Sequence, residues 1–380
     1  MPVDPSLFDR DAEILRQRHG PDVVQSGSEV LAIERIPVDS PSIMRITSGP
    51  DLDGNIVGGV PVGRVTRIYG NESSGKSLFC WNIIKNAQQY RSPRFPDGLS
   101  CCLWDTEKQY DPVFVRKQGV DTDALKIVRL DIIEDIAAAM ELLLRSIHLH
   151  VIDSASFATP LEELVGKQGD KDPQYQVQVG AHARAWKRAI NRIHHAMDPS
   201  RNVLLITDHV GVKNVAAGGY QVEEPLSGRR MRYRSDLSIC FRSGSWLFYD
   251  KRGQLATKDK VKEETGMSPE GQKSADGVVV AVKVDKARVC RPLRTAMMRL
   301  DLRAAEFDHA FELADYAIYY DADGTLAHHS GNPTIAVKSG NFFKVPGYDK
   351  SVNGIGQLRD LIDGDPMLQR TIFASMMKGS

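Results

Sequence analysis

Cysteine is scarce in this chain, and long apolar runs are absent. The five cysteines include no Cys-x-x-Cys pair, so neither a zinc site nor a disulfide framework is indicated, and a reducing, cytoplasmic compartment is expected. No stretch of about 18 apolar residues occurs and the first residues hold no apolar signal segment, so no membrane span is predicted. Net charge is also absent, because 49 basic and 49 acidic residues balance, so any nucleic-acid surface must be a local patch.

Residues 70–78 have the pattern of a phosphate-binding loop that opens a helix. The pattern G-x-x-x-x-G-K-[ST] is matched by Gly70, Asn71, Glu72, Ser73, Ser74, Gly75, Lys76 and Ser77, and Leu78 begins a helix-compatible run. An apolar strand-like segment precedes Gly70, which is the context that this motif needs. Backbone N–H groups of such a loop cradle a polyphosphate, while Lys76 reaches the β- and γ-phosphates and Ser77 holds Mg²⁺. The alternative is a surface turn rich in glycine and serine.

Between residues 61 and 305, apolar strand segments alternate with amphipathic helix segments. Strands are predicted at 100–105, 148–153 and 203–208, and helices at 133–147 and 181–197. This alternation predicts an α/β fold with a mainly parallel, twisted sheet flanked by helices. Three parts are expected: an N-terminal helix–strand arm over 1–45, with its helix at 7–19 and its strand at 29–36, an ATPase core over 46–305, and a small C-terminal α+β domain over 306–380.

Some segments carry little signal of regular structure. Residues 162–180 and 210–228 are expected to be mobile loops at one sheet edge, and the Lys/Glu/Gly-rich residues 251–274 to be a mobile insert. A final helical stretch is expected at 358–377. The run from Arg229 to Arg234 holds four arginines and one tyrosine, which suits phosphate contacts or an interface, but a solvated charged face fits equally well.

Acidic residues follow two of the predicted strands. Asp153 ends the strand at 148–153, beside the phosphate loop at the carboxyl edge of the sheet, so it is a candidate for the Mg²⁺ shell; the alternative is a residue that caps the next turn. A nucleotide hydrolase also needs a group that orients or deprotonates water. Glu107 and Asp105 both follow the strand at 100–105, and spacing alone does not choose between them. The segment 207–209 is placed to sense the γ-phosphate.

The order of these motifs resembles the RecA family of DNA recombinases. The segments that carry the resemblance are Gly63–Ser77, Asp105–Pro112 with the following Arg116–Asp121, Val151–Pro160 and Val282–Arg288, and the likeness runs from about residue 45 to 310. The resemblance implies that Glu107 is the water-activating base and that Asp111 and Phe114 contact adenine. It also implies that Lys286 and Arg288 act in trans on the ATP of a neighbouring subunit, as arginine fingers do.

The resemblance further implies that the loops after Pro160 and His209 bind DNA. The residues expected to contact DNA are Lys167, Lys171, Tyr175, Lys213, Gly218, Gly219, Arg229 and Arg230. Arg232 and Tyr233 fall in an interface segment that couples ATP to DNA. Two departures stand out: Asp208-His209 replaces the Asn-Gln of bacterial members, with His209 still able to bond phosphate, and Leu302 replaces an aromatic residue near adenine. They suggest a divergent member, phage-borne like UvsX.

The sequence is therefore expected to encode a DNA-dependent ATPase that uses ATP and Mg²⁺. We expect it to form helical filaments on single-stranded DNA and to pair that DNA with homologous duplex, with single-strand-binding and loader proteins as further partners. A hexameric RecA-fold motor or helicase is the first alternative, and a nucleotide-holding regulator without turnover is the second.

Overall fold

The computed structural model describes residues 5–19, 23–24, 33–51, 54–165, 180–214, 221–266, 275–324, 327, 331–349 and 351–378. The chain divides into two compact units, Met1–Ile33 and Glu34–Ser380. In the first unit, the helix predicted at 7–19 is confirmed as α1 (Pro5–His19), on which Phe8, Ile14 and Leu15 are exposed. No described helix combines the length and the apolarity that crossing a bilayer requires. The division into three parts stays a prediction.

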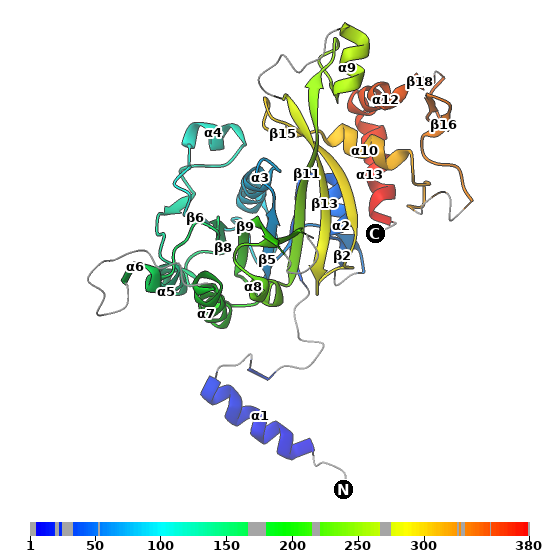
Figure 1. Cartoon of the computed structure of the whole chain (residues 1–380). Helices are drawn as coiled ribbons and strands as arrows, with labels where there is room; N and C mark the ends of the chain where they lie inside the picture. Colours follow the sequence, from blue (N-terminus) through cyan, green and yellow to red (C-terminus); the bar gives the residue numbers. More distant parts are fainter. Residues whose placement is uncertain are drawn as a thin grey trace. The chain divides into compact units, whose positions relative to one another are not determined.

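The second unit is built on one large mixed sheet (Figure 1). Its strand order is β15-β14-β13-β11-β5-β9-β8-β6-β7. The neighbouring parallel strands are β11 (Leu237–Tyr249), β5 (Val65–Gly70), β9 (Val203–Asn214), β8 (Leu149–Asp153), β6 (Cys101–Asp105) and β7 (Lys126–Val128). Antiparallel strands extend the sheet beyond β11: β13 (Gly277–Ala287), β14 (Thr295–Asp301) and β15 (Glu306–Phe307). The predicted α/β class is confirmed, and the phosphate-loop strand β5 lies inside the sheet.

Helices cover both faces of this sheet because its strands carry apolar side chains on both sides (Figure 1). On one face lies α3 (Lys76–Gln89), where the ring of Phe79 meets that of Phe241 edge-on at 5.6 Å between centroids. On the other face, α5 (Ile133–Leu143), α7 (Ala181–Ala196) and α8 (Arg229–Arg234) form one core cluster with Trp104 and Ile206 of the sheet. Adjacent residues of one strand therefore face different helices.

Residues 306–378 add a smaller layer with its own hydrophobic cluster. The elements are α10 (His309–Ala317), β16 (Val337–Ser339), β17 (Phe342–Lys344), β18 (Val352–Asn353), α12 (Gly354–Asp363) and α13 (Pro366–Lys378). The helical stretch expected at 358–377 is present, but it is divided into two helices at Asp365-Pro366. Proline has no N–H and a fixed φ, so it suits the first turn of a new helix better than the interior of a long one.

The remaining short elements lie before the sheet. They are β1 (Arg35–Ile36), α2 (Pro41–Ile46), β2 (Gly49–Pro50), β3 (Ile56–Val57) and β4 (Val60–Pro61). Residues 29–32 of the strand expected at 29–36 fall outside the described residues, 33–34 are not in a strand, and the last two residues form β1, which pairs with β4. Asp39 joins this region to α3, because it accepts a hydrogen bond from Asn82 and forms an ion pair with Lys85.

Two of the segments expected to be loops contain regular structure. Residues 210–214 continue β9 and pair antiparallel with β10 (Gln221–Pro225), while the insert holds β12 (Leu255–Thr257) and α9 (Lys258–Thr265). The mobile-loop prediction is wrong for these residues. Backbone pairing holds the β9–β10 hairpin, which side-chain periodicity does not reveal, and Val261 is the only buried side chain of α9, so that helix lacks an apolar stripe. The loop at 162–180 begins with α6 (Leu161–Val165), and residues 166–179 lie outside the described part.

Candidate nucleotide-binding and coupling site

The phosphate loop connects β5 to α3 at the carboxyl edge of the sheet. Gly70 ends β5 so close to β11 that a Cβ there would lie 1.8 Å from the carbonyl oxygen of Phe241, and Gly75 takes φ 84° just before the helix begins. Only glycine fits both positions without strain. The loop thus brings the N-terminal N–H groups of a 14-residue helix to a concave backbone turn, which is a ready anion site.

Lys76 is buried at the first position of α3. Its Nζ donates hydrogen bonds to the carbonyl oxygens of Gly70, at 3.1 Å, and Asn71, at 2.6 Å. Burial lowers the pKa of Lys76, and the charges of Asp153 and Glu107 oppose that shift. The phosphates of a bound triphosphate would add negative charge beside the buried ammonium and so favour its charged form. Lys76 is already held by the loop that would bind these phosphates.

Asp153, the last residue of β8, lies beside the start of α3. Thr207 donates a hydrogen bond to its Oδ1 at 2.5 Å. Burial raises the pKa of Asp153, as does the charge of Glu107, while hydrogen bonds from Thr207 and Ser77 lower it. Ser77 and Asp153 are therefore neighbouring oxygen ligands of the kind that Mg²⁺ prefers.

These residues fit a magnesium ion that is completed by substrate phosphates and water. The described residues hold no group of three or more His, Cys, Asp or Glu side chains that could bind a metal by themselves. Mg²⁺ commonly takes one or two protein ligands and keeps its other positions for phosphate and water. When bound, it would neutralise charge that develops between the β- and γ-phosphates.

Asp105 is the last residue of β6 and Glu107 lies two residues further on, but their surroundings differ. His209 contacts Glu107 at 3.2 Å between Nε2 and Oε1. Burial alone would raise the pKa of Glu107, but the hydrogen bond from His209 and the charge of Lys76 lower it. An ionised carboxylate this close to Lys76 is placed to accept a proton from water.

Asp105 is occupied by structural contacts. Its oxygens accept the backbone N–H of Gln109 at 3.1 Å and of Tyr110 at 3.4 Å, and an ion pair joins it to Arg129 at 3.3 Å. The side chain is buried and caps the turn after β6. Geometry therefore favours Glu107 over Asp105 as the base.

A family model described as RecA N-terminal domain matches residues 40–303, which is more than half of the sequence. The chain belongs to the RecA family.

The chain is a divergent RecA-family recombinase. It is 29% identical to Protein RecA of Chloroflexus aurantiacus over 90% of this chain and 81% of that protein. It is 28% identical to Protein RecA of Desulfovibrio desulfuricans over 85% and 76% of the two chains, and 29% identical to Protein RecA of Chlorobaculum tepidum over 83% and 77%. Family membership places it among the ATP-binding proteins of DNA recombination and repair.

The two residues predicted to act on a neighbour's ATP lie at the opposite edge of the sheet from the phosphate loop. Lys286 on β13 is level with Ser238 of β11, which is level with Arg67 of β5. Gly70 lies about 10 Å further along that strand. Lys286 Nζ donates to the carbonyls of Arg232, Tyr233 and Ser235, at 2.7, 2.9 and 2.8 Å.

Arg288 lies close to the same helix end. It donates to the carbonyl of Tyr233 at 3.1 Å and pairs with Asp236 at 3.3 Å. Burial lowers the pKa of Lys286, and the charge of Arg288 lowers it further. Both cations are thus anchored at the C-terminus of α8, and the register keeps them away from the phosphate loop of their own chain. Their action in trans stays a prediction.

The predicted adenine contacts and DNA contacts also stay predictions. Asp111 caps α4 (Pro112–Lys117), accepting the N–H of Val113 at 2.8 Å, and Phe114 is exposed on the same turn. Lys213 belongs to β9, and Arg229 and Arg230 open α8, but the structure does not describe these three side chains. The other DNA-binding candidates lie outside the described residues: Lys167, Lys171, Tyr175, Gly218 and Gly219.

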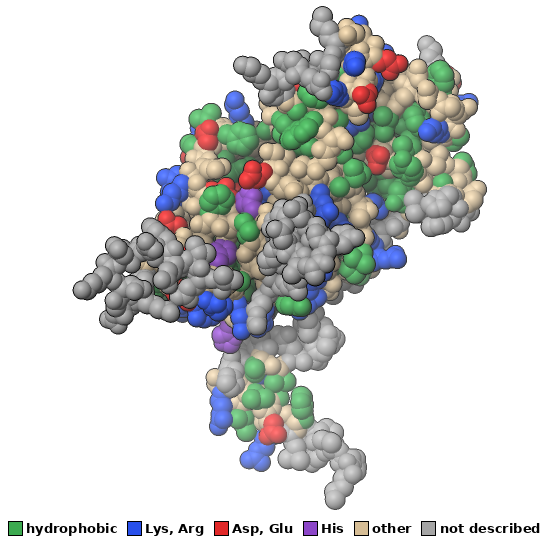
Figure 2. Space-filling view, in the orientation of Figure 1, with side chains coloured by type: hydrophobic (Ala, Val, Ile, Leu, Met, Phe, Trp, Pro, Cys, Tyr) green, Lys and Arg blue, Asp and Glu red, His purple; other side chains and the backbone are tan. Residues whose placement is uncertain are grey.

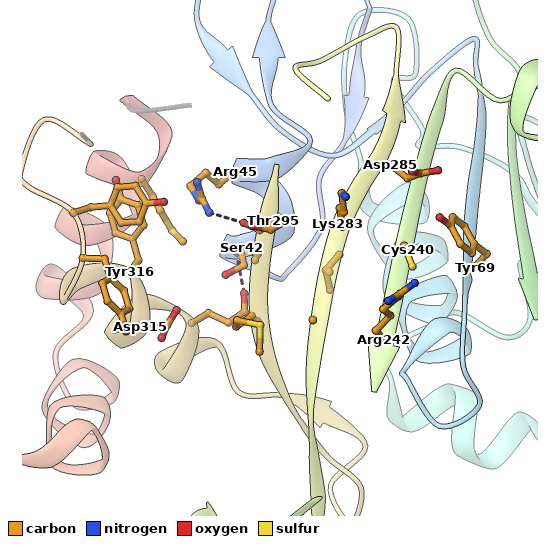
Figure 3. Close-up of a pocket in the computed structure, with 18 residues that line it drawn as sticks. Ser42, Arg45, Tyr69, Cys240, Arg242, Lys283, Asp285, Thr295, Asp315 and Tyr316 are labelled. Carbon is orange, nitrogen blue, oxygen red and sulfur yellow. Dashed lines mark hydrogen bonds between the residues drawn. The ribbon is translucent and has the colours of Figure 1, made fainter. Parts of the chain in front are cut away.

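A second cleft, of about 560 Å³, lies between the sheet and the C-terminal helices, and the sequence analysis missed it (Figure 3). At one end the rings of Tyr316 and Tyr320 stack at 4.2 Å, with the Arg45 guanidinium 5.3 Å from the Tyr320 centroid. Arg242 and Lys283 line the other end, from β11 and β13 (Figure 3). Strand alternation places these two cations on one face, which is the signal that could have found them.

Proposed function

We propose that this chain is an ATP-dependent DNA recombinase that polymerises on single-stranded DNA and pairs it with homologous duplex. Lys76 and the N–H groups of the phosphate loop would bind ATP, Ser77 and Asp153 would hold Mg²⁺, and Glu107 would accept the proton of the attacking water. His209, bonded to Glu107, would report the state of the γ-phosphate to the β9–β10 hairpin.

The register of Lys286 carries this proposal. Lys286 lies two strands away from β5 and about 10 Å short of the phosphate loop along the strand direction. It is therefore poorly placed to contact a nucleotide bound by the loop of its own chain. It would serve the nucleotide of an adjoining subunit that stacks head-to-tail on this one. Heterologous contacts of that kind generate helices or rings. ATP at such a junction would set the geometry of the polymer.

The distribution of surface charge supports attraction of DNA by local groups of basic side chains rather than by the net charge of the chain. On the face drawn in Figure 2, basic and acidic side chains are interspersed, in keeping with the balanced formal charge. The cleft at Arg242 and Lys283 also holds tyrosine rings, but the carboxylates of Asp285, Glu312 and Asp315 line it as well, so it is not a basic patch.

Electron microscopy with ATP and single-stranded DNA tests the proposal. We expect helical filaments that require both ATP and DNA, and pairing of the bound strand with homologous duplex in a separate assay. Closed rings that translocate along DNA would instead indicate a motor. Particles that bind nucleotide without turnover or assembly would indicate a regulator.

A further inference from the structure

Arg67 and Asp208 form an ion pair that is almost completely inaccessible to solvent. Arg67 lies in the middle of the phosphate-loop strand β5, and Asp208 lies in the neighbouring strand β9. Their side chains are 1% and 0% exposed, and Arg67 Nη2 lies 2.5 Å from Asp208 Oδ2. The Arg67 guanidinium also lies 5.2 Å from the Tyr69 ring centroid. A buried ion pair adds little net stability to a fold, because the cost of desolvating both charges offsets their attraction.

The pair occupies the face of the sheet opposite the candidate magnesium site. Thr207 points to the face of α3, where it bonds Asp153. Asp208, the next residue of β9, points to the face of α7 and α8 because side chains alternate along a strand. His209 then bonds Glu107. Three consecutive residues of β9 thus have different partners. Thr207 contacts Asp153, Asp208 pairs with Arg67, and His209 contacts the candidate base Glu107.

Asp208 also holds the segments from which both predicted DNA-binding loops arise. Ser156, which follows β8 and precedes the first loop, donates its hydroxyl to Asp208 Oδ1 at 2.7 Å. Ser227, which lies near the end of the second loop segment at 210–228 and just before α8, donates its hydroxyl to Asp208 Oδ2 and accepts from Arg67 at 3.1 Å. The backbone N–H of His209 donates to Ser156 Oγ at 2.8 Å. A neutral amide at position 208 would lack the charge that strengthens these bonds.

We propose that Arg67 and Asp208 are positioning residues that tie the bases of both DNA-binding loops to the phosphate-loop strand, and so couple DNA binding to ATP turnover. A shift of β9 when ATP binds would move Thr207, Asp208 and His209 together, and Ser156 and Ser227 would transmit it to the two loops. This inference rests on the proposed function, because it presumes that these loops bind DNA.

Serine variants test the coupling without leaving a buried charge unpaired. The double variant Ser156→Ala/Ser227→Ala removes both hydroxyl contacts to Asp208. We expect the stimulation of ATP turnover by single-stranded DNA to fall about fivefold or more, which is a usual size for coupling between sites. ATP affinity and turnover without DNA should stay close to those of the unaltered chain. Ser238→Ala is the matched control, since Ser238 is buried beside Arg67 and its hydroxyl has no partner among the described residues.

The neutral pair Arg67→Met/Asp208→Asn separates coupling from stability. Either single change leaves a buried charge alone and should lower the melting temperature, whereas the double variant should recover much of it. DNA stimulation should stay low in the double variant, and recovery of both properties would show that the pair is only structural. If the neutral pair does not fold, full DNA stimulation in the serine double variant overturns the inference. An unaltered chain that DNA does not stimulate would instead refute the proposed function itself.

Discussion

Replacing Lys76 with alanine should lower the rate of ATP turnover by about a hundredfold or more. The Lys76 ammonium is the one cation that the phosphate loop itself holds, through the carbonyls of Gly70 and Asn71. Without it, the charge that develops on the transferred phosphoryl group loses the ammonium that the loop holds in place. The fold should tolerate the change, because burial already disfavours the ammonium, as its lowered pKa indicates. Steady-state ATP hydrolysis, with and without single-stranded DNA, measures the loss.

Lys85→Ala is the matched control for this variant. Lys85 lies on the same helix, where it pairs with Asp39 and has no contact with the phosphate loop. The Lys85→Ala variant should hydrolyse ATP at the rate of the unaltered chain. Undiminished turnover in Lys76→Ala would refute the assignment of residues 70–77 as the phosphate loop.

Replacing Glu107 with glutamine should separate ATP binding from ATP hydrolysis. The amide keeps the shape and can still bond His209, but it cannot take a proton from water. We expect turnover to fall by about a hundredfold or more, while ATP affinity changes little. Filaments on DNA should then persist, because the step that releases them is blocked. Single-turnover hydrolysis and the lifetime of DNA complexes after dilution measure the two effects.

Asp105→Asn distinguishes the base from its neighbour on the same strand end. Asp105 accepts backbone N–H groups and pairs with Arg129, so its loss should lower the melting temperature and leave the rate per folded molecule nearly unchanged. If Asp105→Asn instead removes turnover and Glu107→Gln retains it, the two assignments must be exchanged.

Local sequence patterns predicted which candidate residues would meet at the carboxyl edge of the sheet. Lys76 and Ser77 belong to one contiguous motif, Asp153 ends a buried strand and Glu107 lies two residues past the end of another, so parallel pairing alone brings them to one edge. The choice of Glu107 over Asp105 needed either the family resemblance or the contacts that occupy Asp105. Sequence spacing could not decide between the two carboxylates, because both lie at the end of the same strand.

Long-range contacts were beyond the reach of the sequence. Arg67, Ser156, Asp208 and Ser227 are far apart in the chain and meet only because β5 and β9 are neighbours. The sequence did show that Asp208 departs from the amide of bacterial relatives, but not that Arg67 would balance it. The strands β10 and β12 were missed because they form by antiparallel pairing with β9 and β11, and such pairing cannot be read from a local sequence pattern.

The most direct test of the account is complementation between two inactive variants. Lys76→Ala lacks a working phosphate loop but keeps Lys286 and Arg288, whereas Lys286→Ala/Arg288→Ala has the loop and lacks both cations. Each variant alone should be inactive, and retained ATP binding by the second variant confirms that its fold is intact.

In an equal mixture that assembles at random, about a quarter of the junctions would join an intact loop to intact cations. If ATP is shared between subunits, DNA-stimulated ATP turnover should return in the mixture, to about that fraction of the unaltered chain. Turnover in the mixture no greater than the sum of the two variants alone would contradict ATP shared between subunits.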